Sequence, residues 1–357
     1  MTYSLKKRTK RMAINAYHSL CIDKLLVKVG HSSFKKKKEK AYSCFLSDDE
    51  RRNVELLHKL NEDIKSCYMK YLTSPDEFFL FGFKDNTSEA YRSTFLSDNV
   101  RLRTLIKVVG EKLFVEELTD KIGFYRLTKP YFKREVFKFT PATSYTDFSD
   151  FALRTRHLFV KLLASSYGIG AMAIDIANDE QCREAYDKLR KSGKVWIVEQ
   201  RIIQKGVFAE WNSSSVNTVR VPSFLHNGKF EIVQPFFRTG RAGSLVDNAG
   251  GGGILACVDV KTGRLTTDGC DEVGRFYKAH PNSGIVFKGW QIPEWDCLKA
   301  LVEEVHRTKM SHHRYIGWDF AYTGDDWVLI EGNWGQFVGQ YADHVGVKKI
   351  FFNYMNK

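Results

Sequence analysis

The feature that most constrains the fold is a pair of apolar segments near the C-terminus, separated by a short polar turn. Residues 315–322 and 327–333 are rich in aromatic and aliphatic side chains, and the turn between them reads Thr-Gly-Asp-Asp. This pattern predicts a β-hairpin. A three-residue loop at residues 324–326 would pair Thr323 with Trp327 and fix the register of both strands.

In that register, three oxygen-bearing side chains meet on one face of the sheet. Asp319 lies opposite Glu331, and Asn333 follows two positions later along the second strand. Carboxylate and amide oxygens are the ligands that Mg²⁺ prefers in proteins. The alternatives are a solvated turn, or a one-residue slip that sends the side chains to opposite faces. The apolar surroundings favour the metal site, because an embedded charge needs a partner.

The length and composition indicate a globular protein with several packed units. The chain has 357 residues, of which 43% are hydrophobic, enough for two or three cores. Its seven cysteines are widely spaced and include no Cys-x-x-Cys pair, which argues against a disulfide framework or a zinc site and favours a reducing compartment. No apolar run approaches the roughly 20 residues that span a bilayer. We therefore expect a cytoplasmic protein.

The positive charge is concentrated at the N-terminus. The net charge is +13, and residues 1–40 contain twelve Lys or Arg against two acids. Basic clusters flanking an apolar stretch suit an anionic membrane surface, which would place the protein peripherally at the inner membrane face. A solvated arm explains the same pattern equally well. Nucleic acid is an unlikely partner and ranks third, because no helix-turn-helix, zinc-finger or RNA-binding signature accompanies the charge.

The segment after the basic arm is expected to be mainly helical. Ser47 and Glu50 form a capping box that opens a helix with apolar residues at helical spacing as far as Tyr68. Further helices are expected from Ser88 onward, over residues 97–109 and over 111–118.

From about residue 135 the pattern changes to strands mixed with helices, in two successive α+β units. Expected strands are residues 135–139, 157–163, 170–176 and 195–203, with a helix over 178–191; later come hairpins at 226–228 and 261–263, a strand through 236–238 and a helix over 294–309. Two such units joined at an apolar strand predict a cleft between them, where nucleotides commonly bind.

A lysine and a glycine-containing loop provide candidate phosphate contacts. Lys161 lies at the end of an apolar strand, and residues 165–170 follow with two glycines and two serines. Backbone N–H groups of such a loop can cover phosphates while the lysine supplies a positive charge. The chain has no Gly-x-x-x-x-Gly-Lys-Ser/Thr motif, so it is not a P-loop protein. The glycine run 250–253 indicates a mobile loop beside the site.

The order of these elements resembles the ATP-grasp superfamily. The lysine strand and glycine loop come first, then the apolar strand 196–202 with its acid at the exit, then the arginine strand 217–221 and finally the Asp, Glu and Asn of the hairpin. The strand 196–202 looks like the hinge that holds adenine in that superfamily. The likeness extends over about residues 118–333, beginning with the Asp-Lys segment at 120–121.

Several motifs resemble one branch, the sugar-transfer associated ATP-grasp proteins of extracellular and capsular polysaccharide synthesis. They are Asn217-Thr218-x-Arg220, the run from Phe237 to Asn248, Gly252-Gly253, His280-Pro281 and Gly317-Trp318-Asp319. The chain departs from that pattern after Lys161, where Leu162-Leu163 replaces the usual proline, and at Ile169, where a lysine is frequent.

The resemblance implies an α+β fold of the ATP-grasp type, with two α+β lobes sandwiching ATP after a mainly helical N-terminal region. The implied divisions are a basic arm (1–40), a helical region (41–117), a first ATP-grasp lobe (118–204) and a second lobe with the metal site (205–357).

The resemblance also implies roles for individual residues. ATP would be bound by Lys121, Lys161, Ser166, Gly168, Gly170, Glu199, Gln200 and Ile202; two Mg²⁺ ions by Asp319, Glu331 and Asn333; and phosphates by Arg220. Arg238 and Arg241 are candidates to hold an acidic acceptor or its acyl phosphate. Asn248 lies beside them, and His280 is a candidate proton shuttle, although a histidine before a proline is commonly a turn residue.

The implied function is an ATP- and Mg²⁺-dependent carboxylate-amine ligase that forms ADP. Phosphoryl transfer needs alignment and charge neutralisation, so the lack of a nucleophilic triad is expected. The substrates would be a small-molecule or glycan carboxylate and an amine, in the modification of capsular or extracellular polysaccharide. The alternatives are an ATP-grasp kinase acting on a sugar hydroxyl, and a non-catalytic nucleotide-binding scaffold of a polysaccharide assembly complex.

Overall fold

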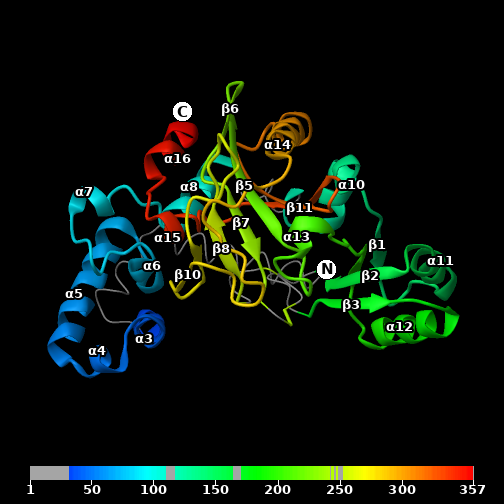
Figure 1. Ribbon diagram of the computed structural model, residues 1–357, viewed down its shortest axis with the longest axis horizontal. Coiled ribbons are helices and arrows are strands. Elements are labelled where there is room, and N and C mark those ends of the chain that lie inside the picture. The colour runs from blue at the N-terminus through cyan, green and yellow to red at the C-terminus, as the bar shows by residue number, and fades with distance from the viewer. Residues whose placement is uncertain are drawn as a thin grey trace. The chain divides into compact units, whose positions relative to one another are not determined.

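A computed structural model describes residues 32–109, 117–163, 170–241, 243–244, 247 and 252–356 (Figure 1). The chain divides into two compact units. Residues 1–110 and 336–357 belong to the first, and residues 111–335 form the second. Within the described ranges, no helix combines the length and the apolar character that crossing a bilayer requires.

The first unit is helical. Its helices are α3 (Ser32–Phe45), α4 (Asp48–Arg52), α5 (Val54–Tyr71), α6 (Pro75–Leu80), α7 (Glu89–Arg92), α8 (Asp98–Val109), α15 (Gln340–Asp343) and α16 (Lys348–Met355). Aromatic side chains fill its core, among them Phe78, Phe81 and Phe83, each at most 1% exposed. The expectation of a mainly helical region before the strands is confirmed.

The predicted capping box is present, but the helix that it opens is short. Ser47 accepts a bond from the backbone N–H of Glu50, whose carboxylate accepts one from the Ser47 N–H. This helix, α4, ends at Arg52 because Asn53 adopts an extended backbone and caps the next helix, accepting from the N–H of Leu56. The prediction of one continuous helix was therefore wrong at Asn53, where the side chain competes with the helical backbone.

The C-terminal helices are tied to the first unit by a buried glutamine. The Gln340 side chain accepts a bond from the backbone N–H of Leu96 at 3.0 Å and donates to the Leu96 carbonyl at 3.1 Å. Lys348 donates its backbone N–H to the Thr94 carbonyl at 3.0 Å. The last 20 residues therefore complete a fold that begins more than 200 residues earlier.

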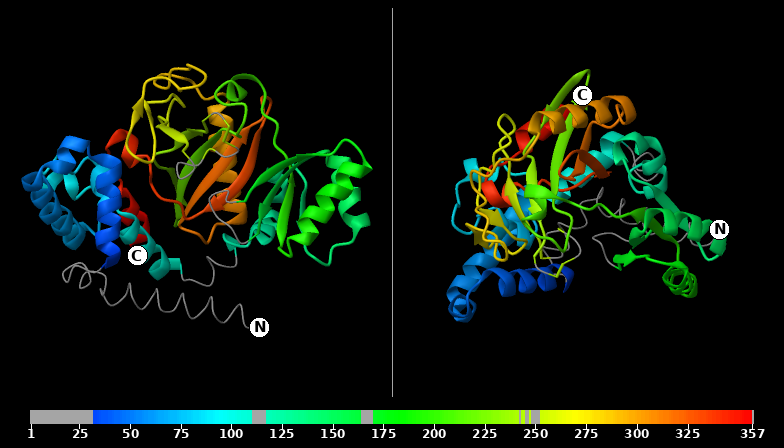
Figure 2. Two further views of the ribbon diagram at one scale, coloured as in Figure 1. Left: turned by 90° about the horizontal axis from the view of Figure 1, so that it is seen from below. Right: turned by 45° about the vertical axis from the view of Figure 1, so that its right-hand side comes forward.

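The second unit begins with α10 (Lys121–Phe132), which leads to a four-stranded sheet. The strands lie in the order β1 (Val136–Phe139), β4 (Trp196–Gln200), β2 (His157–Leu162) and β3 (Met172–Asp175), all antiparallel. Helices α11 (Tyr145–Thr155) and α12 (Asp179–Lys191) pack through one core on a single face of this sheet. That face is turned away from the larger sheet (Figure 2).

An eight-stranded antiparallel sheet forms the rest of the second unit. It contains β5 (Thr218–His226), β6 (Lys229–Ile232), β7 (Phe236–Thr239), β8 (Ile254–Cys257), β9 (Gly269–Cys270), β10 (Phe276–Tyr277), β11 (Tyr315–Tyr322) and β12 (Trp327–Asn333). The short helix α13 (Gly206–Ala209) precedes it, and α14 (Trp295–Lys309) packs against β5 while α10 packs against β12. The predicted strands and the 226–228 turn are confirmed, the latter with Asn227 and Gly228 at positive φ.

The hairpin of β11 and β12 has the predicted register at one end only. Asp319 lies opposite Glu331 as expected, but Tyr322 lies opposite Trp327, so the three-residue loop was wrong. A β-bulge between Asp319 and Phe320 absorbs the difference, leaving Ile330 as the extra residue of β12. The bulge restores the predicted register where the acids lie.

Candidate functional site

Asp319 is the most deeply buried acid of the site. It is 1% exposed and forms a two-point ion pair with Arg220, in which Nη2 lies 2.7 Å from Oδ2. Arg238 approaches the other oxygen, with Nη2 at 3.1 Å from Oδ1. Burial opposes ionisation, but the attraction of Arg220 and Arg238 outweighs it and lowers the pKa of Asp319. Asp319 is therefore a carboxylate held between two guanidinium groups.

Glu331 lies beside Asp319 and has a different electrostatic environment. Burial and the neighbouring charge of Asp319 raise the pKa of Glu331, and the attraction of Lys161, Arg220 and Arg238 only partly offsets them. Paired carboxylates with one raised pKa need either a shared proton or an added cation.

Asn333 completes the set predicted from the hairpin. Its amide oxygen accepts a bond from Arg220 Nη1 at 3.2 Å, and its amide nitrogen lies 3.4 Å from Glu331 Oε1. The structure thus brings Asp319, Glu331 and Asn333 together on one face, with the guanidinium of Arg220 between the first and the last. Three oxygen donors at this spot suit Mg²⁺.

Lys161 and Glu199 project from the smaller sheet and pair with each other. Lys161 Nζ lies 2.5 Å from Glu199 Oε1, and Arg134 Nη2 lies 2.7 Å from Oε2. Burial of Glu199 opposes its ionisation, but Lys161 and Arg134 together lower its pKa to about 2. The Glu199 carboxylate therefore forms ion pairs with both Lys161 and Arg134, and it fixes the position of the Lys161 ammonium.

Lys121 is the first residue of α10, and its charge interacts with those of Lys161, Glu331 and Glu199. Burial and the positive charge of Lys161 lower the pKa of Lys121, while Glu331 and Glu199 act in the opposite direction. The two lysines predicted to bind phosphates are thus close enough to repel each other, which an anionic ligand would relieve.

A pocket of about 320 Å³ lies beside the strand predicted to hold adenine. Ile202 lines it together with Phe159 and Ala173 of the smaller sheet and residues 212–216 of the larger lobe. Gln200 ends β4, and its side-chain oxygen accepts from the Glu135 N–H at 3.4 Å. An apolar wall with a few polar groups is suited to a purine ring.

Arg238 is tied to the larger sheet by several acceptors. Its Nε donates to Thr218 Oγ1 at 2.9 Å and lies 3.5 Å from Asp247 Oδ2, in addition to its contact with Asp319. Burial raises the pKa of Asp247, and the charge of Arg238 only partly counters this.

Arg241 is more accessible, with 34% of its side chain exposed. Its Nη2 lies 3.5 Å from the buried carboxylate of Asp271, its Nε donates to the Gly252 carbonyl, and its guanidinium lies 5.8 Å from the centre of the Tyr277 ring. The Tyr277 hydroxyl donates to Asp271 at 2.9 Å. Arg241 is therefore held by Asp271, Gly252 and Tyr277, while about a third of its side chain remains exposed.

His280 is buried and both of its ring nitrogens are engaged. Nε2 donates to the Gly240 carbonyl at 2.8 Å, and Nδ1 accepts from the Ser283 N–H at 3.2 Å. Burial lowers the pKa of His280, which keeps the ring neutral. In this arrangement His280 supports the backbone just before Arg241, as a turn residue would.

The remaining predicted residues fall at or beyond the edges of the described ranges. Gly170 is described and has φ 76°, a conformation that favours glycine. Ser166, Gly168 and Asn248 lie outside the described residues, as do the expected helix over 111–116 and most of the basic arm.

Sequence reasoning missed Arg134 at the site, and it named Asn217 in a motif without giving it a role. Arg134 lies between α10 and β1 and binds Glu199 and the Leu329 carbonyl, the latter at 2.6 Å. Asn217 anchors the start of β5 by donating to the Phe208 carbonyl at 2.7 Å and accepting from Thr239 at 2.8 Å. Arg134 lies in a Lys-Arg-Glu run that looks like solvated surface, so nothing in the local sequence marks it.

The two antiparallel sheets, with cations and acids facing each other, form an ATP-grasp fold in a mixed α+β chain. The model of the sugar-transfer associated ATP-grasp family matches residues 172–350, half of the chain, and the protein belongs to this family. Enzymes of the ATP-grasp superfamily generally use ATP and Mg²⁺. No curated protein sequence matches the chain.

Solved structures similar to the chain include three from bacteria. D-alanyl-alanine synthetase A from Vibrio cholerae has 14% identity and a TM-score of 0.37, over 60% of this chain and 54% of that one. The D-alanine-D-alanine ligase from Coxiella burnetii has 12% identity and a TM-score of 0.35, over 60% and 47%. A RimK domain ATP-grasp protein from Sphaerobacter thermophilus has 12% identity and a TM-score of 0.40, over 68% and 70%. The match spans about half the length of the first two.

Proposed function

We propose that this protein is an ATP- and Mg²⁺-dependent ligase that activates a carboxylate as an acyl phosphate and joins it to an amine, releasing ADP and phosphate. We further propose that it acts in the modification of capsular or extracellular polysaccharide, in keeping with its family. The observation that carries the proposal is a pair of adjacent acids, the buried Asp319 and the half-buried Glu331, which face the Lys161 ammonium across the two sheets.

The acids of the larger sheet fit a divalent cation. Asp319, Glu331 and Asn333 would hold Mg²⁺, which would neutralise and orient the phosphates of ATP. The raised pKa of Glu331 supports this assignment, because the two carboxylates repel each other without an added positive charge. In the structure, Arg220 supplies part of that positive charge. Its guanidinium bonds to oxygens of Asp319 and Asn333, which are the oxygens that would hold the metal.

The cations of the cleft fit the phosphates. Lys161 is positioned by Glu199, and Lys121 lies close enough to share its electrostatic field. We assign both ammonium groups and the Arg220 guanidinium to phosphate oxygens, and the apolar pocket at Ile202 to adenine. In this arrangement Glu199 acts through Lys161 and its carboxylate does not touch the nucleotide.

Arg241 is the better candidate to hold the acceptor carboxylate. Arg238 already contacts Asp319 and Thr218, whereas Arg241 has an exposed edge and a rigid support in Asp271. A guanidinium fork binds a carboxylate through two parallel hydrogen bonds. A carboxylate oxygen of the acceptor would then attack the γ-phosphorus of ATP and release ADP, and the amine nitrogen would next attack the acyl carbon and expel phosphate.

The test is a substrate panel with Mg²⁺ and ATP. We expect ADP release to require a carboxylate and an amine together, and hydroxylamine to trap the activated acid as a hydroxamate. Arg241→Lys should raise the KM for the acid with a smaller change in the KM for ATP. ADP release that depends on no carboxylate, or a phosphorylated sugar formed without amide, would refute the ligase and point to the kinase alternative.

For localisation, we propose a cytoplasmic protein that contacts the anionic inner membrane face through its basic arm. The described part of that arm is α3, where Lys35, Lys36 and Lys37 are exposed while Phe34 is buried in the helical core. Each lysine near an anionic surface contributes about 1 kcal/mol of binding free energy. The core contact of Phe34 fixes which face of α3 the lysines can present.

Vesicle sedimentation tests the membrane proposal. Replacing Lys35, Lys36 and Lys37 by Gln should weaken binding to phosphatidylglycerol vesicles by at least tenfold and leave ATP turnover unchanged. The matched control replaces three exposed lysines of the α12 region, Lys188, Lys191 and Lys194, and should have little effect. Equal losses in both variants would mean that only net charge matters, and no loss in either would exclude the membrane contact.

A further inference from the structure

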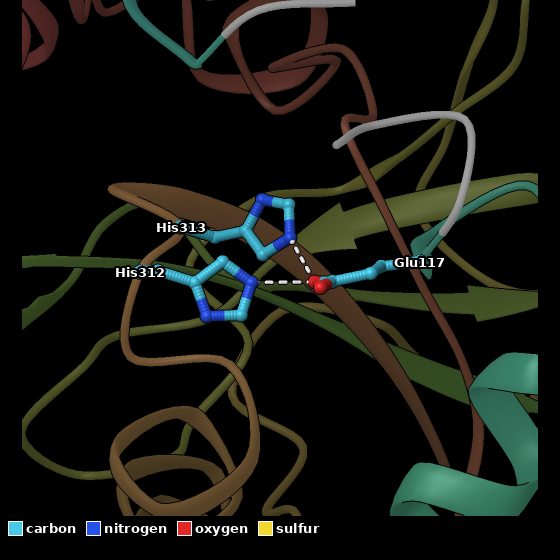
Figure 3. Close-up of side chains that lie close together, drawn as sticks. All are labelled: Glu117, His312 and His313. Carbon is cyan, nitrogen blue, oxygen red and sulfur yellow. Dashed lines mark hydrogen bonds and ion pairs between the residues drawn. The ribbon is translucent and has the colours of Figure 1, made fainter. Parts of the chain in front are cut away.

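Outside the ATP cleft, two consecutive histidines converge on one carboxylate. Figure 3 shows the rings of His312 and His313 aimed at Glu117 from the turn between α14 and β11. The two Nε2 atoms lie 2.5 Å and 2.8 Å from the same oxygen, Oε2. Glu117 lies 195 residues before His312 in the sequence, so the fold alone brings the carboxylate to the two histidines.

His313 is held rigidly by its surroundings. Its ring is fully buried, its backbone N–H donates to the Met310 carbonyl at 2.9 Å, and its own carbonyl accepts from His306 Nε2 at 2.8 Å. The second ring nitrogen of His306 accepts from the Ser223 hydroxyl at 2.8 Å, which links the turn to β5. The position of the His313 Nε2 atom is therefore set before any ligand binds.

A hydrogen-bonded clasp is the alternative explanation of this cluster. In such a clasp both Nε2 atoms carry protons and share one carboxylate oxygen as acceptor. The other ring nitrogen of His313, Nδ1, is buried and has no hydrogen-bond partner among the described residues, and this is so whether Nε2 bonds to Glu117 or to a metal. The case for a metal therefore rests on the geometry and chemistry of the three donor atoms.

The same three atoms form a small, closed set of metal donors. All three candidate ligand atoms lie within 4.8 Å of one another. Two imidazoles and one carboxylate are a common donor set for Zn²⁺, which is tetrahedral with ligand distances of about 2.0–2.2 Å. Its ligand atoms lie roughly 3.3 Å apart, so the Nε2–Oε2 distances of 2.5 Å and 2.8 Å would lengthen by about 0.5–0.8 Å. His312 is 42% exposed, which leaves its ring free to make that adjustment.

We propose that Glu117, His312 and His313 bind a divalent transition metal, with Zn²⁺ the best match, and that the fourth ligand is water. His312 also lines an adjoining pocket of about 400 Å³, together with His226, Arg307 and Arg314, through which water reaches the metal. Nitrogen donors separate this site from the all-oxygen set in the cleft, because Mg²⁺ prefers oxygen ligands. The metal would link Glu117, which lies just before α10 and its residue Lys121, to the turn between α14 and β11.

The experiment uses the full-length protein stripped with a chelator and then titrated with Zn²⁺. We expect one equivalent to bind, a rise in melting temperature, and a visible d–d absorption band of tetrahedral type when Co²⁺ replaces Zn²⁺. Glu117→Gln and His312→Ala should each weaken Zn²⁺ binding by at least about tenfold and abolish the Co²⁺ band. A large excess of Mg²⁺ should not displace the metal.

The matched control is His58→Ala, which removes an exposed imidazole from α5 and should retain the full Zn²⁺ equivalent. His312 is partly exposed, so its alanine variant should fold, and circular dichroism verifies this. Absence of binding by the unaltered protein would overturn the proposal, as would retention of the metal in both Glu117→Gln and His312→Ala. Either result would leave the cluster as a hydrogen-bonded clasp.

Discussion

Two glutamates, the buried Glu199 and the half-buried Glu331, lie on opposite sheets of the cleft, and their surroundings shift their pKa values in opposite directions. Glu199 on β4 is paired with Lys161 and Arg134, which lower its pKa to about 2. Glu331 on β12 lies next to Asp319, and burial and that neighbouring charge raise its pKa. A carboxylate that is already neutralised contributes to stability, whereas the one that is not neutralised is where we propose that a cation binds. The acid of the smaller sheet thus positions cations of the protein, and the acids of the larger sheet are our proposed metal ligands.

The largest effect should come from Glu199→Gln. The change leaves the buried Arg134 and the half-buried Lys161 without the carboxylate that pairs with both, and breaking such a pair costs about 3–5 kcal/mol in the free energy of unfolding. Urea unfolding measures it. The matched control is Glu135→Gln, an exposed acid paired with Arg154 beside β1, which should cost less than about 1 kcal/mol. Equal stabilities of the two variants would show that the Glu199 pair is not structural.

Glu331→Gln should give the reverse result, with little loss of stability and a large loss of activity. Removing the charge relieves repulsion with Asp319, so the unfolding free energy should stay constant or rise. Turnover of Mg-ATP should fall by about 10²–10³-fold, since a preorganised electrostatic contact to the phosphates is lost. ADP release and urea unfolding on the same preparation measure both. Normal turnover by the variant would refute the metal role of Glu331, and ATP binding without turnover by the unaltered protein would favour the non-catalytic scaffold.

The two glutamates should also respond oppositely to pH. The folded pKa of Glu199 is below its ordinary value of 4.5, so its stabilisation is complete above pH 4.5 and is lost as the pH falls toward 2, by about 3 kcal/mol. The folded pKa of Glu331 is raised, so without metal its contribution is largest at low pH and declines as the pH rises above 4.5. Unfolding free energies measured across this pH range test both statements. As the pH rises, Glu199→Gln should become less stable than the unaltered protein, and Glu331→Gln should become more stable than it.

The smallest effects should come from glycines that pack against Arg220. A Cβ added to Gly335 would lie 2.2 Å from Arg220 Nη1 and 2.6 Å from Asn333 Oδ1, whereas one at Gly317 would meet Arg220 at 3.3 Å or more. Gly335→Ala should therefore displace the guanidinium and weaken Mg-ATP binding about tenfold, since small misplacements are costly in such sites. Gly317→Ala should change it only two- to threefold. Calorimetric titration with Mg-ATP measures the affinity of each variant. Weaker binding by Gly317→Ala than by Gly335→Ala would show that the position of Arg220 does not set the affinity.

Local patterns were sufficient to predict much of the larger sheet. Alternation and turn residues located the hairpin, and period two placed Glu331 and Asn333 on one face of it. The predicted pairing of Asp319 with Glu331 is confirmed only because the bulge compensates for the longer turn. The turn itself was misread because a bulge at Ile330 has no reliable sequence signal. The break at Asn53 was missed for a related reason, since the same side chain can end one helix and begin the next.

The partners of the charged residues could not be predicted in the same way. Arg134 lies 65 residues from Glu199, and Arg220 lies 99 residues from Asp319. Each arginine alone looks like a surface residue or a phosphate ligand. Only the three-dimensional arrangement of the chain shows that Arg134 neutralises Glu199. It also shows that Arg220 lies between two of the predicted metal ligands, Asp319 and Asn333.

The sequence by itself determined that Glu331 and Asn333 share a face, because residues two apart along one strand point the same way. Whether Asp319 joins them was decided by the bulge at Ile330, which shifts the pairing of β11 with β12. The sequence also determined the order of elements by which the family is identified. The tertiary structure alone decided which acids are neutralised, because burial and the distance between charges depend on residues far apart in the chain. The same reason explains why Glu117, His312 and His313 meet at a point that no local pattern indicates.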